Sequence, residues 1–199
     1  MAPDPFAPTT HHGAIMTPAE KLSLWIRSHV PATSGPVSHL KLQKLLFYSY
    51  AGALAFDHDA EVGEISFEAW RHGPVNPETV ERFRSHADAP LPPPADTVSY
   101  GAEVEQTLSD VLGVYAWLSP WALRQQSHLE APWIDASRLG GQRRIERESI
   151  RRHFVAKFRD DVRLPEYLGR SSSFRIDGIP TARFGSLHEL AQQLSARLG

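Results

Sequence analysis

Cysteine is absent from the 199-residue chain. A chain without cysteine has no disulfide framework, no thiolate nucleophile and no cysteine metal site, and this composition is typical of the reducing cytoplasm. The N-terminus also lacks the basic, apolar and small-residue pattern of a secretory signal, and the apolar runs are too short and interrupted to span a bilayer. We therefore expect a cytoplasmic protein without a membrane partner.

A strong excess of either charge is lacking too. The chain has 21 Lys and Arg residues against 23 Asp and Glu residues, a net charge of -2, which argues neither for nor against an acidic partner. Its 41% hydrophobic and 22% charged residues are ordinary for a soluble globular protein. The length suits one large domain or a domain with an appendage.

Motifs for catalysis are missing as well. The ten histidines include no H-E-x-x-H, and the chain has no G-x-S-x-G and no glycine-rich phosphate loop. We find no nucleophile with a base. The sequence therefore predicts no catalytic, metal-binding or cofactor-binding residues, and we expect a protein that is not an enzyme. A small hydrolase would need a pocket of convergent polar groups that the sequence does not indicate.

The longest apolar stretch runs from Leu40 to Phe56. Apolar residues stand at nearly every helical register there, which is typical of a buried helix. The hydrophilic exceptions are Lys41, Lys44 and Tyr48, spaced i, i+3 and i+7, so they mark one narrow stripe that we expect to reach solvent or a partner. These three residues are the first candidates for partner binding.

Local signals predict a mainly α-helical fold with one short strand. Thr17-Pro18-Ala19-Glu20 reads as a capping box, and Ser38, Asn76-Pro77 and Ser119-Pro120 read as helix starts. Between them, residues 65–70 alternate apolar and polar side chains, which is typical of a strand.

Three regions follow from the composition. Residues 1–16 form a flexible arm, residues 17–158 a compact helical domain with the short β element, and residues 159–199 an extension. In the extension, residues 174–181 predict a β-hairpin and Ser186 begins an amphipathic helix. Within the domain, the proline-rich segment Asp88 to Asp96 predicts an extended linker.

Two oppositely charged regions stand out. Five acidic residues form one edge: Asp57, Asp59, Glu61, Glu64 and Glu68. A predicted basic helix over residues 142–159 carries seven cations: Arg143, Arg144, Arg147, Arg151, Arg152, Lys157 and Arg159. The basic helix could serve nucleic acid or an acidic protein, be a solvated face, or pair with the acidic edge. No base-reading motif accompanies it, so a nucleic-acid-binding regulator is the second choice.

Three motifs occur in order: LKLQKLLFYSYAGALA, then FEAWRHGPVNP, then SHLEAPW followed by IRRHF. Together they resemble the Panacea-domain family of SocA-like antitoxins, over about Thr17 to Phe158. The family positions matched here are Leu42, Lys44, Leu45, Leu46, Ala69, Trp70, Gly73, Pro74, Val75, His128, Glu130, Pro132 and Trp133.

The resemblance implies an antitoxin that binds and neutralises a toxin protein encoded beside it. SocA-like members also act as proteolytic adaptors that present a toxin to the ClpXP protease, so the implied partners are the cognate toxin and the ClpX unfoldase. Whether neutralisation works by occlusion or by promoted degradation stays open.

Further candidate partner residues are Trp70 and His72 beside the glycine-proline turn, and Arg144, Arg147 and Arg151 on the basic helix. Trp70 and Trp133 have core packing as their alternative. For Lys44 the alternative is an ion pair, with Glu68 or Glu130 as the partner carboxylate. We expect the Lys41 stripe and the basic helix to face the toxin, and the C-terminal helix or the arm to engage the second partner.

Overall fold

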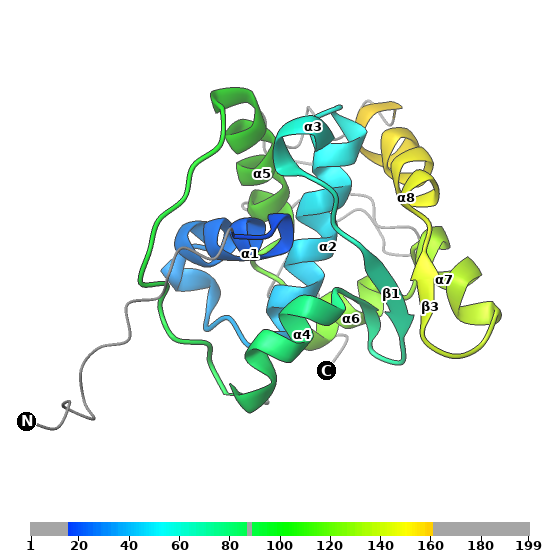
Figure 1. The fold of residues 1–199 in the computed structure, drawn as a ribbon, viewed down its shortest axis with the longest axis horizontal. Helices are drawn as coiled ribbons and strands as arrows, with labels where there is room; N and C mark the ends of the chain where they lie inside the picture. Colours follow the sequence, from blue (N-terminus) through cyan, green and yellow to red (C-terminus); the bar gives the residue numbers. More distant parts are fainter. Residues whose placement is uncertain (1–15, 87–88, 161–199) are drawn as a thin grey trace, which may run out of the picture.

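The computed structural model describes residues 16–86 and 89–160, and Figure 1 shows them as a helical domain with a small sheet. The predicted fold class is confirmed, mainly α with a short β element. Most of the predicted arm, and the C-terminal hairpin and helix, lie outside the described residues. Within residues 16–86 and 89–160, no helix is both long and apolar enough to cross a membrane.

Helix α2, His39–Ala55, runs through the middle of the molecule. Ser38 caps it as predicted, because its Oγ accepts a hydrogen bond from the Lys41 backbone N–H at 3.3 Å. Every residue from Lys41 to Ala55 is buried. A helix that is apolar at nearly every register can bury its whole circumference only where neighbours cover all of its sides, and α2 has such neighbours.

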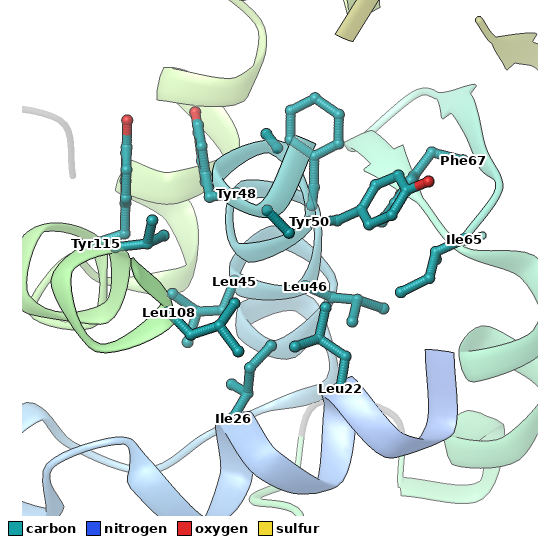
Figure 2. Close-up of a cluster of buried hydrophobic side chains, with 14 of the residues drawn as sticks. Leu22, Ile26, Leu45, Leu46, Tyr48, Tyr50, Ile65, Phe67, Leu108 and Tyr115 are labelled. Carbon is teal, nitrogen blue, oxygen red and sulfur yellow. The ribbon is translucent and has the colours of Figure 1, made fainter. Parts of the chain in front are cut away.

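Two of these neighbours are α1, Pro18–His29, and α5, Ala102–Tyr115. The capping box predicted at Thr17 is present, with Glu20 closing it. Figure 2 shows Leu22 and Ile26 of α1 and Leu108 of α5 meeting Leu45 and Leu46 of α2. Helix α5 comes so close that a Cβ on Gly52 would lie 2.7 Å from Val111 Cγ2, which explains the glycine in α2.

On its opposite side α2 contacts α8, Arg147–Phe154, which continues as a π-helical segment, Val155–Asp160. Ile150, Phe154 and Phe158 are buried against the core. The basic helix predicted over residues 142–159 is wrong in its first part, because Arg143–Ile145 form a strand, β3, that pairs with β1.

The sheet has three antiparallel strands in the order β2-β1-β3. Strand β1, Phe67–Trp70, lies where the alternation predicted it, and β2 is Gly73–Val75. Sequence analysis predicted neither β2 nor β3. Both are three residues long, and β2 contains a proline, so neither carries the alternation that reveals a strand.

Shorter helices complete the fold and position its loops. They are α3, Asp59–Val62; α4, Pro77–Phe83; α6, Pro120–Ser127; and α7, Ala131–Arg138, with 3-10 turns at Ala32–Ser34 and Arg84–His86. The predicted caps are confirmed: Asn76 accepts from the Thr79 N–H and Ser119 from the Ala122 N–H. The end of the proline-rich segment nearest α2 is packed, because the Leu91 N–H donates to the Val37 carbonyl at 2.9 Å.

Candidate functional site

The Lys41, Lys44 and Tyr48 stripe does not reach solvent. Their exposed fractions are 1%, 0% and 0%, so the prediction of an exposed stripe is wrong. Each polar end meets an internal partner: Ser34 O for Lys41, Pro74 O for Lys44 and Glu130 Oε1 for Tyr48. The spacing correctly indicated one helix face, but contacts distant in sequence decide whether such a face is exposed.

Lys44 lies under the turn between β1 and β2. Its Nζ donates to the Pro74 carbonyl at 2.7 Å, and no ion pair joins it to a carboxylate among the described residues. The prediction of an ion pair with Glu68 or Glu130 is therefore not met. Burial lowers the pKa of Lys44 well below its usual value, and the positive charge of Arg124 acts in the same direction.

The turn above Lys44 requires glycine for two reasons. Gly73 has a φ of 94°, a conformation that side chains rarely adopt. A Cβ there would overlap Ser127 Oγ and lie 2.9 Å from Lys44 Nζ. Lys44 and Ser127 are both fully buried, so solvent does not reach this pair. At Gly73, β2 therefore packs closely against both α2 and α6.

A second buried polar cluster centres on Glu130, which is 2% exposed. Its carboxylate accepts from Tyr48 Oη at 3.0 Å and Lys157 Nζ at 2.7 Å, and lies 2.7 Å from His153 Nε2. Burial alone would raise the pKa of Glu130, but the His153 hydrogen bond and the Lys157 charge outweigh it and lower the pKa. Tyr48 also stacks on Tyr115, with ring centroids 3.9 Å apart (Figure 2).

A surface cluster lies at the same turn, formed by the exposed His72 and Trp121 and the half-buried Arg124, and we call it the turn surface. The Arg124 guanidinium lies 4.4 Å from the centre of the Trp121 ring, and its Nε donates to His72 Nδ1 at 3.1 Å. Trp121 is 46% exposed, although tryptophan usually buries most of its surface. A large ring held by an arginine is ready to bind without much loss of side-chain entropy.

Sequence analysis named His72 but missed Trp121 and Arg124. The signal was available: Trp121 follows Pro120 in the first turn of a capped helix, and Arg124 stands three residues later on the same face. What the sequence could not give is their nearness to His72, which lies about fifty positions earlier in the chain and arrives through the sheet.

Trp70 and Trp133, the two tryptophans considered as partner contacts, make internal contacts near this turn. Trp133 Nε1 donates to the Trp70 carbonyl at 3.1 Å, and the Trp133 ring stacks on His128 with centroids 4.0 Å apart. Trp70 Nε1 donates to Glu68 at 2.7 Å. Burial lowers the pKa of His128 to about 4, with the Arg124 and Lys44 charges adding to the effect, so His128 is neutral at physiological pH.

The basic candidates pair with the acidic edge, one of the three alternatives that the sequence offered. Arg144 pairs with Glu64 at 3.0 Å and Arg147 pairs with Asp59. Arg151 makes the most contacts of the three. Its guanidinium pairs with Asp57 at 2.7 Å and with Asp59 at 2.8 Å, and its Nη1 also donates to the Leu54 carbonyl at the end of α2. These arginines fasten β3 and α8 to the α2–α3 junction.

By its fold, the protein is a mainly helical domain built on one buried helix and a three-stranded antiparallel sheet. The family model described as "Antitoxin SocA-like, Panacea domain" matches residues 42–134, which span α2, the turn at Gly73, α6 and the start of α7. This match confirms the predicted resemblance to the Panacea domain of SocA-like antitoxins over residues 42–134. Comparisons with curated proteins and with solved structures find no match.

Proposed function

We propose that the protein is a non-enzymatic antitoxin that binds and neutralises a protein toxin, and that the turn surface is its contact with the toxin. The matched antitoxin domain supports the role, and the exposed Trp121 held by Arg124 supports the place. Tryptophan and arginine are the residue types that dominate binding energy at protein interfaces. The scaffold under them is rigid, because Gly73 packs directly on Lys44 and Ser127.

The other residues predicted to bind a partner are less suited to contact the toxin. Lys41, Lys44 and Tyr48 are buried, and Arg144, Arg147 and Arg151 already have carboxylate partners. An arginine that is already paired within the chain would exchange one ion pair for another of similar small value, so the exchange brings little net free energy. The same pairing removes the main support for a nucleic-acid-binding regulator. Of the predicted residues, His72 is thus the one placed best for the toxin.

The experiment is toxin rescue with the protein encoded in the neighbouring reading frame. We expect coexpression of the full chain to restore growth, and the purified proteins to form a complex. Trp121→Ala and Arg124→Ala should each weaken binding by about 2 kcal/mol, roughly 30-fold in Kd. The matched controls are Leu139→Ala and Arg138→Ala, which remove side chains at the end of α7 that are more exposed than Trp121 and Arg124 and should leave the Kd unchanged.

Two outcomes would contradict the proposal at different levels. If the neighbouring protein neither arrests growth nor binds, the antitoxin role is wrong for that pair. If it binds but the Trp121 and Arg124 variants bind as tightly as the control variants, the antitoxin role stands and the turn surface is wrong. Circular dichroism and urea unfolding of each variant separate lost contacts from lost folding.

We propose further that the captured toxin is delivered to ClpXP. An adaptor promotes degradation by raising the effective concentration of its cargo at the protease rather than by chemistry. In a reconstituted assay the toxin should be degraded several-fold faster when the full chain is present with ClpXP. A toxin that is bound but degraded no faster would limit the mechanism to occlusion.

A further inference from the structure

A cleft of about 470 Å³ opens at the N-terminal end of α2, on residues that the proposed toxin contact does not use. Its wall comes from four segments: the loop before α2, the first turn of α2, the start of α6 and the proline-rich segment at Pro90. The volume lies within the range of small-ligand sites in proteins. The lining includes Lys41 and no acidic residue.

Lys41 is a buried cation without a counter-ion. It is 1% exposed, and its Nζ donates to the Ser34 carbonyl at 2.8 Å, which occupies one of the three N–H groups of the ammonium. Among the described residues no carboxylate pairs with Lys41. Burial accordingly lowers the pKa of Lys41 to about 8. A buried ammonium costs free energy unless an anion meets it, and the cleft is where an anion can arrive.

The surroundings of Lys41 favour a negative charge in a second way. Helices α2 and α6 both begin at the cleft wall, with Ser38 and Ser119 as their caps. The positive ends of two helix dipoles thus lie at the wall of the cleft that Lys41 also lines. One cation suits a single negative charge, so a carboxylate matches the cleft better than a doubly charged phosphate does.

Apart from Lys41 and three serines, the cleft is lined by apolar residues and one glycine. Pro90, Pro120 and Trp117 line it, and the Pro90 segment is held to α2 by the Leu91 N–H bond to the Val37 carbonyl. Proline and aromatic walls are suited to an extended peptide, whose apolar side chains they cover while a polar group fixes its position.

We propose that this cleft binds a carboxylate carried on an extended peptide segment of a partner protein, with Lys41 as the counter-ion. The carboxylate is either an acidic side chain or a chain end, and both share the same chemistry at Lys41. The site is a second recognition surface besides the turn surface. The proposal rests on the cleft and on Lys41, so it does not depend on the proposed toxin contact.

The test is an NMR titration of the ¹⁵N-labelled full chain with capped tetrapeptides. The probes are Ac-Ala-Pro-Leu-Glu-NH₂, with a side-chain carboxylate, Ac-Ala-Pro-Leu-Gln-OH, with a terminal one, and the neutral Ac-Ala-Pro-Leu-Gln-NH₂. We expect one or both carboxylate peptides to shift the backbone amides at the starts of α2 and α6, and the neutral peptide to bind at least about tenfold more weakly, a difference of about 1.4 kcal/mol. The peptide that binds identifies the source of the carboxylate.

Lys41→Met removes the charge and keeps the length of the side chain. We expect this variant to lose the preference for the carboxylate peptides. The control is Lys21→Met, which removes an α1 lysine that lies over the Tyr100 ring, and we expect the control to keep the preference. A second measurement uses the chain without substitutions, so it does not depend on the variant folding. In that chain the pKa of Lys41 should rise when the carboxylate peptide binds. Equal binding of the neutral peptide, no binding of any peptide, or tighter binding of inorganic phosphate would each overturn the proposal.

Discussion

At the scale of single residues, the polar positions of α2 separate what sequence can predict from what it cannot. The i, i+3, i+7 spacing placed Lys41, Lys44 and Tyr48 on one face, and the structure agrees. The spacing could not reveal that two distant groups would cover that face: the Pro74 carbonyl, about thirty positions after Lys44, and the Glu130 carboxylate, about eighty positions after Tyr48. Burial of a polar side chain depends on such distant partners, whereas helix caps depend on neighbours three residues away. The caps were therefore predicted correctly and the stripe was not.

Gly73→Ala tests the close packing at the turn. We expect a loss of about 2–3 kcal/mol in the free energy of unfolding, because alanine is strained at a φ of 94° and its Cβ would overlap Ser127 Oγ. Urea unfolding followed by circular dichroism measures it. The matched control is Gly113→Ala in α5, where a Cβ meets nothing within 4 Å; there we expect a gain of about 0.5–1 kcal/mol. A Gly73→Ala protein as stable as the natural one would contradict the packing argument.

At the scale of elements, the molecule is fastened by two kinds of polar contact. Arg144, Arg147 and Arg151 attach β3 and α8 to the acidic edge at the surface, where salt screens charges and each pair contributes little. Inside, Glu130 joins the start of α7 to α2 and to the end of α8 through Tyr48, His153 and Lys157. The charge counts of the two regions suggested the surface pairing. The inner cluster carried no such signal, because Glu130 is separated from each of its three partners by more than twenty positions.

Glu130→Gln tests the inner cluster. The amide cannot be the anion that Lys157 and His153 contact, so we expect a loss of about 3 kcal/mol in the free energy of unfolding at neutral pH. The folded pKa of Glu130 is lowered, so its contribution is fully present above the unfolded pKa of about 4.3 and is lost as pH falls through the folded value. The difference between the two proteins should therefore shrink under acid conditions.

Urea unfolding of both proteins as a function of pH measures this difference. Glu148→Gln is the control, because that carboxylate is 71% exposed and lies 4.0 Å from Arg151; we expect less than about 0.5 kcal/mol at any pH. A Glu130→Gln effect that stays constant through the acid range would show that the substitution acts through shape and not through charge.

At the scale of the whole molecule, the matched region and the folded unit differ in extent. The antitoxin family model covers residues 42–134, but α1, β3 and α8 lie outside it. From α1, α8 and the π-helical continuation of α8, six large apolar side chains that are at most 1% exposed enter the common core: Leu22, Trp25, Ile26, Ile150, Phe154 and Phe158. The expected domain, residues 17–158, follows the predicted reach of the motif resemblance, so it is wider than the matched region and includes all six side chains. We propose that the wider unit is the one that folds.

Two fragments test this proposal, residues 16–160 and residues 42–134. Each of the six side chains contributes about 1.5–3 kcal/mol on burial, so together they contribute an amount similar to the whole stability of a domain, about 5–15 kcal/mol. We therefore expect the shorter fragment to show no cooperative urea transition and to bind a hydrophobic dye, because α2 loses its cover on two sides. The longer fragment should unfold in one cooperative step with a midpoint close to that of the full chain. A cooperative transition in the 42–134 fragment would mean that α1 and α8 are accessories to the core and not parts of it.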